Sequence, residues 1–170
     1  MKTLILRLLI ALGSCMLSPN YIVANQECKM DENLISLNKE IIQRYFEEAW
    51  NQGKLEVLDE IIAPNYINHS PGMPNPIPGP EGLKPIIAGL RKAFPDLCFT
   101  IENMIITENQ VAIHCTMVGT HKGDLFGLPP TGKKVKINQM QIERIKDGQI
   151  VEHWRQSDDL GMMRLLGQID

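Results

Sequence analysis

The chain has 170 residues, of which 44% are apolar, 22% charged and 5% aromatic. This composition is typical of a single globular domain and excludes disordered, collagen-like and coiled-coil chains. The 17 Lys and Arg against 20 Asp and Glu give a net charge of −3 without charged blocks, which argues against a protein that binds nucleic acid through phosphate contacts.

Residues 1–24 are predicted to be an export signal, so we expect a periplasmic or secreted protein. Their only charged residues, Lys2 and Arg7, lie before an apolar run that is too short to span a bilayer. Two processing sites are open. Cleavage after Ala24 is favoured, whereas Cys15 in Leu12-Gly-Ser-Cys15 resembles a lipobox and would give a lipid anchor, the only membrane contact we expect.

The first half of the domain is predicted to be helical. Residues 25–36 are expected to form a flexible segment, and apolar side chains at helical spacing predict helices over 37–50 and 55–63. The Pro- and Gly-rich stretch 65–79 predicts a long loop. A third helix is expected from Pro80 to Phe94, with a late start or a kink at Pro85.

The second half is predicted to be mostly β-structure. Runs rich in β-forming residues predict one hairpin over 97–107 and 111–119, and a second over 134–145 and 149–157. A short helix follows over 159–166. Helices followed by hairpins indicate a single α+β domain over 37–170, with the helices packed on one face of a curved, mainly antiparallel sheet that encloses a pocket.

The register of the second hairpin has two alternatives. A three-residue loop pairs Ile145 with Gln149, and it then sets Met140 opposite Trp154 and Asn138 opposite Gln156 under the helices. A two-residue Asp-Gly turn shifts every pair by one and brings Gln139 and Gln141 to that face instead. We favour the first, with a bulge near Asn138 to accommodate Val135 and Ile137, which have the opposite parity.

Several motifs together resemble the SnoaL-like polyketide cyclase family, which is described as ester cyclases of the nuclear-transport-factor-two-like superfamily. The resemblance runs from about Asn38 to Gly167. Its motifs are Tyr66-Ile-Asn-His69, Gly79-Pro-Glu-Gly82, Ala93-Phe-Pro-Asp96, Gly119-Thr-His-Lys-Gly-Asp-Leu-Phe-Gly-Leu-Pro-Pro-Thr-Gly132 and His153-Trp154 followed by Asp158-Asp-Leu-Gly161.

The resemblance implies a conical fold, a homodimer and intramolecular aldol cyclisation or a related isomerisation of a small hydrophobic carbonyl compound. It also implies chemistry without a metal or cofactor, and the absence of HxH or HExxH spacing agrees with the lack of a metal site. The alternative is an exported protein that binds a hydrophobic ligand without catalysis, because one fold hosts many functions.

The family's acid/base residue corresponds to Asp158, which we expect to face the pocket. A carboxylate beside apolar walls has a raised pKa, so it can take a proton from carbon and return it to oxygen. The alternative is that Asp158 caps the last helix, a role we instead give to Asp159. The pocket is expected to contain Trp154 as a wall, His69 and His121 as proton donors or loop ties, and three residues from the favoured register, Asn138, Met140 and Gln156.

Overall fold

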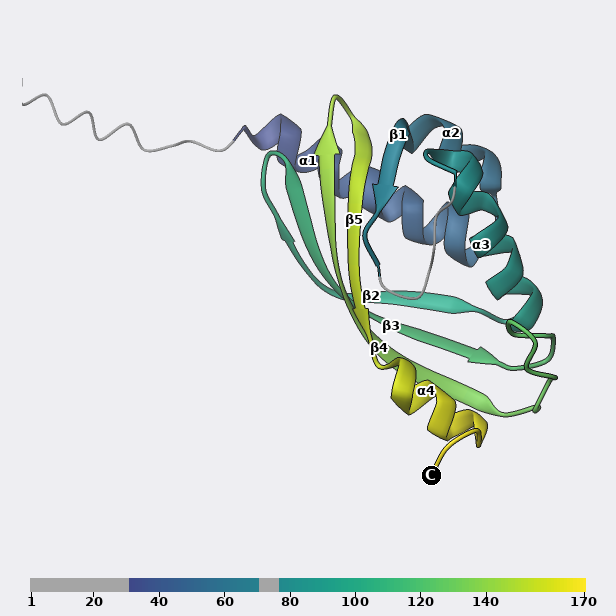
Figure 1. Ribbon diagram of the computed structural model, residues 1–170. Helices are drawn as coiled ribbons and strands as arrows, with labels where there is room; N and C mark the ends of the chain where they lie inside the picture. The colour runs from purple at the N-terminus through teal and green to yellow at the C-terminus, as the bar shows by residue number, and fades with distance from the viewer. Residues whose placement is uncertain (1–30, 71–76) are drawn as a thin grey trace, which may run out of the picture.

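The computed structural model describes residues 31–70 and 77–170 (Figure 1). Both processing sites of the expected export signal, after Ala24 and at Cys15, lie outside these residues. Within the described ranges, no helix combines the length and apolar character that crossing a membrane requires.

The first helix begins earlier than expected. Helix α1 (Glu32–Arg44) starts inside the segment predicted to be flexible, because Asp31 Oδ1 accepts hydrogen bonds from the backbone N–H groups of Asn33 and Leu34 at 2.9 and 3.3 Å. The helix continues as a π-helical segment, Tyr45–Asn51. Segments of this kind are frequent at functional sites, and two of its aromatic residues reach the cavity described below.

The second predicted helix is shorter than expected, and a strand follows it. A 3₁₀ turn leads into α2 (Leu58–Ile61), and the chain then forms β1 (Ile62–Asn68) where we expected the end of a helix and a loop. Pro64 did not prevent a strand, because β1 lies at the sheet edge and its ladder is irregular between Ile62 and Ile67.

Helix α3 (Pro80–Ala93) begins at Pro80 and continues through Pro85, so of the two outcomes expected at Pro85 the late start does not occur. Gly79 precedes it with φ of +77°, a conformation that favours glycine. Together α1, α2 and α3 lie over the concave face of the sheet, as Figure 1 shows.

The sheet contains five strands in the order β1-β5-β4-β3-β2. Strands β2 (Cys98–Ile106), β3 (Gln110–Thr120), β4 (Lys134–Lys146) and β5 (Gln149–Ser157) are antiparallel neighbours, whereas β1 pairs with β5 in parallel. This confirms the predicted α+β class with a mainly antiparallel sheet.

The favoured loop of the second hairpin is wrong and the alternative two-residue turn is correct, but beyond Arg144 the pairs lie one residue further along, with Ile142 opposite Trp154. Lys146 pairs with Gln149 across a two-residue Asp147-Gly148 turn, in which both residues have positive φ, +51° and +78°. Burial alternates without interruption along β4, so there is no bulge near Asn138. The ladder instead shifts beside Arg144, opposite the stretch of β5 between Ile150 and Glu152.

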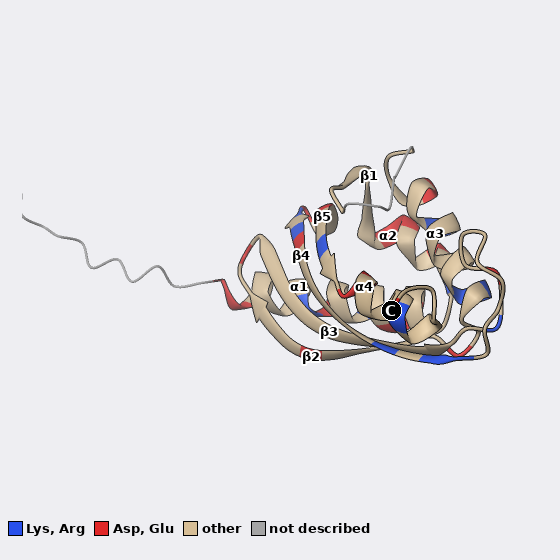
Figure 2. Ribbon diagram, turned by 60° about the horizontal axis from the view of Figure 1, so that its bottom comes forward, with Lys and Arg blue, Asp and Glu red and all other residues tan. Residues whose placement is uncertain are grey.

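Helix α4 (Asp159–Leu166) follows β5 directly and packs against β4. It ends at Gly167 in the left-handed conformation, and Leu166 is buried in the core. Lys and Arg are interspersed with Asp and Glu over helices and strands in Figure 2.

Candidate functional site

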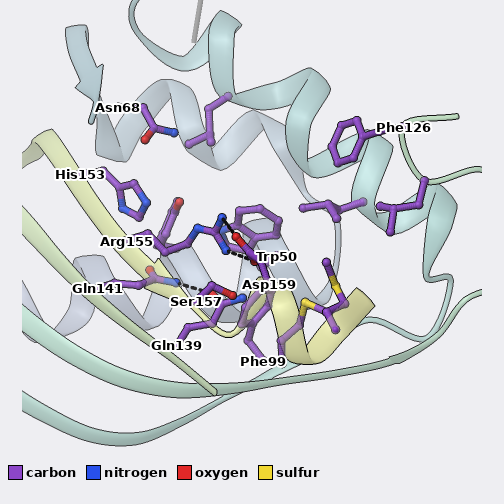
Figure 3. Close-up of a pocket in the computed structure, with 16 residues that line it drawn as sticks. Trp50, Asn68, Phe99, Phe126, Gln139, Gln141, His153, Arg155, Ser157 and Asp159 are labelled. Carbon is purple, nitrogen blue, oxygen red and sulfur yellow. Dashed lines mark hydrogen bonds and ion pairs between the residues drawn. The ribbon is translucent and has the colours of Figure 1, made fainter. Parts of the chain in front are cut away.

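A cavity of about 150 Å³ lies between the helices and the concave face of the sheet (Figure 3). The π-helical segment contributes Tyr45 and Trp50, and α3 contributes Leu83 and Leu90. The remaining lining residues come from β1, the sheet, the β3–β4 connection and α4: Asn68, Phe99, Met117, Leu125, Phe126, Gln139, Gln141, His153, Arg155, Ser157, Asp159 and Met162.

Polar side chains line the sheet side of this otherwise apolar cavity. On β4, the amide of Gln141 donates to Gln139 Oε1 at 3.0 Å. Three polar atoms here are buried and have no hydrogen-bond partner in the described part of the chain, namely Gln141 Oε1, Arg155 Nε and Ser157 Oγ. Buried polar atoms are nearly always paired, so these unpaired groups favour a ligand in the cavity.

The strongest chemical feature of the site is a buried pair on neighbouring strands. His153 Nδ1 lies 2.6 Å from Glu143 Oε1, and the two side chains are only 7% and 1% exposed. Burial raises the pKa of Glu143, and the contact with His153 offsets part of that rise. Nε2 of His153 makes no hydrogen bond to any described residue, and His153 lines the cavity.

The Glu143 carboxyl also affects groups around it. Burial is the main cause that raises the pKa of Tyr45, and the nearby Glu143 carboxyl raises it further. The Tyr45 hydroxyl therefore stays protonated and is a hydrogen-bond donor in the cavity wall. The same two causes raise the pKa of the Cys115 thiol to about 12. Neutral donors and the buried Glu143 carboxyl group therefore surround the imidazole.

Arg155 provides the positive charge in the cavity. Its side chain is 13% exposed, and it pairs with the carboxylate of Asp159 only at the long distance of 3.5 Å. Because Asp159 is 56% exposed at the start of α4, solvent weakens this pair. The guanidinium can therefore donate to an oxygen of a ligand.

Asp158 does not lie where we expected. Its Oδ1 accepts the N–H of Gly161 at 2.8 Å, so Asp158 caps α4, and the neighbouring Asp159 lines the cavity. The expected division between the two residues is therefore reversed. The correct register explains this, because His153, Arg155 and Ser157 face inward and place Asp158 on the outer parity of the strand.

Trp154 and His69 also lie outside the cavity. Their rings stack with centroids 4.7 Å apart and planes at 10°, and His69 Nε2 contacts Glu152 Oε2 at 2.9 Å. Arg144 covers the indole at 5.3 Å from its centroid. These four residues form a cluster on the outer face of β5 and β4, where neither ring lines the cavity.

The three pocket residues taken from the favoured register lie on the same outer face. Asn138 and Gln156 are exposed, and Met140 is 55% exposed. Their placement in the pocket was therefore wrong. Because burial alternates along β4 without a bulge, side chains with the parity of Val135 and Ile137 face inward, and these residues face outward.

His121 is buried but serves the loop between β3 and β4. Its Nδ1 accepts the backbone N–H of Thr131 at 3.3 Å, and its ring packs against Phe94. It is absent from the cavity wall, which agrees with the alternative that it ties the loop. No group of three metal-ligating side chains occurs within residues 31–70 and 77–170.

Glu143 and His153 were not predicted as site residues, although the sequence carries a signal for Glu143. Val135, Ile137 and Ile145 share one parity on β4, and continuing that alternation places Gln139, Gln141 and Glu143 inward. The Asp-Gly turn alone would set Glu143 opposite Glu152, and the shift of the ladder beside Arg144 brings His153 opposite Glu143.

The chain is similar to proteins of one family over most of its length. A family model described as SnoaL-like polyketide cyclase matches residues 40–166. Aklanonic acid methyl ester cyclase DauD of Streptomyces sp. (strain C5) is 34% identical over 124 residues, which cover 71% of this chain and 76% of that protein. Nogalonic acid methyl ester cyclase of Streptomyces nogalater is 31% identical over 121 residues, or 70% of this chain and 90% of that protein.

Among solved structures, a candidate polyketide cyclase from Acidithiobacillus ferrooxidans is similar over 79% of this chain and 96% of its own. The TM-score is 0.69 and the sequence identity is 33%. The similarity therefore extends over most of the described fold.

Proposed function

Because the chain belongs to the SnoaL-like polyketide cyclase family, we propose that its cavity closes a ring in a carbonyl compound by acid/base chemistry. The observation that carries this proposal is the buried pair of His153 and Glu143 beside an apolar cavity. Two curated relatives are named as cyclases of polyketide methyl esters, and we propose a substrate of related chemistry for this chain.

In the proposed reaction, His153 Nε2 removes a proton from the carbon next to a carbonyl group. Glu143 accepts the Nδ1–H hydrogen bond, which fixes the ring and stabilises the imidazolium that forms. The enolate carbon then attacks a second carbonyl carbon of the same molecule and forms the new carbon–carbon bond. The resulting alkoxide takes the proton back from the imidazolium, so no other reactant is needed.

The enolate and alkoxide oxygens need hydrogen-bond donors in a site with little water. Arg155 and Ser157 have buried polar atoms without partners, and the protonated Tyr45 hydroxyl lies in the same wall. We propose that these three groups stabilise the negative charge. Asp158 has no position in this scheme, because its carboxylate is used at the start of α4.

The proposal is tested by turnover of a polyketide methyl ester with a His153→Gln variant, which keeps a polar side chain but removes the titrating ring. We expect a loss of about 100- to 10,000-fold, the usual contribution of a general acid/base. The matched control is His69→Gln, since His69 also contacts a glutamate but lies outside the cavity. Equal activity of the two variants would contradict the proposal.

The homodimer also remains a proposal, and the outer face of the sheet is its best interface. Ile105, Ala112, Ile142 and Trp154 form one apolar row across four strands, with Ile105 72% and Ile142 43% exposed. A two-fold axis would place this row against its own copy. Light scattering should give twice the monomer mass for the wild type and the monomer mass for Ile142→Lys.

Export of the protein is proposed on the sequence of the leader alone. Mass spectrometry of the mature N-terminus distinguishes cleavage after Ala24 from a lipidated Cys15. A full-length chain that begins at Met1 in the cytosol would contradict both.

A further inference from the structure

The loop between β3 and β4 holds one aromatic side chain at the edge of the cavity. Leu125 is buried, and its backbone exchanges two hydrogen bonds with Leu128, of 3.0 and 2.9 Å. Asp124 Oδ1 accepts the N–H of Gly127 at 3.0 Å. These contacts hold Phe126, which follows Leu125, in a fixed turn, and its side chain is among those that line the cavity (Figure 3).

Phe126 has two unfavourable properties in the free protein. Its side chain lines the cavity, yet the residue is 82% exposed to water, the highest value among the exposed large apolar residues. Its φ is +50°, in the left-handed region that bulky residues rarely adopt. Asn or Gly would suit this backbone better. Strain of this kind is typical of functional positions, so the aromatic ring needs an explanation beyond folding.

The size of the cavity supplies the explanation. A volume of about 150 Å³ accommodates a single benzene-sized ring. Cavities that enclose a whole drug-sized ligand measure roughly 300 to 1,000 Å³. A ligand with several fused rings therefore places one ring inside, and the rest extends out to the exposed edge, where Phe126 lies.

We propose that Phe126 is a stacking platform that selects planar, fused-ring substrates, one ring of which enters the cavity while the others pack on the exposed phenyl face. This inference rests on the proposed function, because the ligand uses the same cavity. Offset or edge-to-face packing of aromatic rings adds affinity beyond the buried area. It also gives the strained, exposed ring a use that it lacks in the free protein.

The experiment compares two probes that share a hydroxymethyl group, benzyl alcohol with one ring and 2-(hydroxymethyl)anthraquinone with three fused rings. Dissociation constants are measured by calorimetry for the wild type, Phe126→Asn, Phe126→Tyr and Ile77→Asn. The last variant is the control, since it removes an apolar side chain that is 54% exposed and does not line the cavity. Indole N–H signals in NMR spectra locate the probes, because Trp50 lines the cavity and Trp154 does not.

We expect Phe126→Asn to weaken binding of the three-ring probe about five- to tenfold and to leave benzyl alcohol unchanged. Phe126→Tyr and Ile77→Asn should bind both probes as the wild type does. Phe126→Asn should also melt about 2 °C higher, because Asn tolerates the left-handed backbone. This opposite effect on stability and affinity distinguishes a binding role from a structural one.

The proposal is overturned if Phe126→Asn weakens the binding of both probes equally, or of neither probe. It is also overturned if neither probe binds in the cavity, as judged by a shift of the Trp50 signal. Its failure is separate from failure of the cyclase proposal. His153→Gln with wild-type turnover would remove the acid/base role and leave the ratio of probe affinities unchanged.

Discussion

Replacing Glu143 by Gln is the most informative perturbation of the buried pair. Glu143 is 1% exposed on its side chain and contacts His153 at 2.6 Å, so its protonation is linked to the stability of the fold. Gln keeps the size and a hydrogen-bonding group but cannot titrate. The wild type and Glu143→Gln should therefore differ in the pH dependence of unfolding and not only in its magnitude.

The sign follows from the direction of the pKa shift. Burial raises the pKa of Glu143 above its value of about 4.5 in an unfolded chain, so the folded protein holds this proton more tightly. The stabilising contribution is complete below pH 4.5 and is lost as the pH rises toward the folded-state pKa. The loss can reach about 1.4 kcal/mol per pH unit for one proton, and it stops once the folded-state pKa is passed.

The assay is urea unfolding of both proteins at half-unit steps between pH 4 and pH 8. We expect the free energy of unfolding of the wild type to fall relative to Glu143→Gln as the pH rises. Glu152→Gln serves as control, because Glu152 also contacts a histidine but lies on the outer face, and it should keep the wild-type slope. Parallel curves for the wild type and Glu143→Gln, or a difference of opposite sign, would refute the reasoning.

Three further predictions concern the rest of the fold. Asp158→Ala should reduce the free energy of unfolding by about 1 kcal/mol, because the α4 cap is lost, whereas Asp158→Asn should keep the wild-type value. An equal loss in both variants would contradict the capping role. Gly123→Ala should melt well below the wild type, because the new Cβ would overlap the backbone carbonyl of Lys92, which cannot move aside. An unchanged melting temperature would contradict this packing. A thiol reagent at pH 8 should label exposed Cys98 and not Cys115, whose pKa of about 12 leaves only ~10⁻⁴ of it as thiolate; labelling of Cys115 first would contradict its burial.

Elements with strong local patterns could be predicted from the sequence. Apolar spacing and β-forming runs identified the main helices, both hairpins and α4 within a few residues. Strand β1 could not be predicted, because it contains Pro64 and pairs only with β5, about 85 residues later in the chain. A short edge strand of this kind depends on a tertiary partner and not on its own pattern.

The candidate site depended on one choice that local patterns did not settle. The longer loop was favoured because it places the apolar Met140 and Trp154 together under the helices. The Asp147-Gly148 sequence, and the alternation that begins at Val135, favoured the shorter turn. The inward face of β4 carries polar side chains in its middle, because this stretch lines a cavity. A prediction that apolar side chains face inward therefore chose the wrong face of the strand there. His153 was consequently not among the expected pocket residues, although it is buried and lines the cavity.

The central claim is that His153 in the cavity, and not Asp158 at the helix cap, is the acid/base group. The most direct measurement is turnover of aklanonic acid methyl ester, the compound named for one curated relative, by the wild type, His153→Gln and Asp158→Asn. We predict conversion by the wild type and Asp158→Asn at similar rates, and a loss of about 100-fold or more in His153→Gln. An active His153→Gln beside an inactive Asp158→Asn would contradict the account.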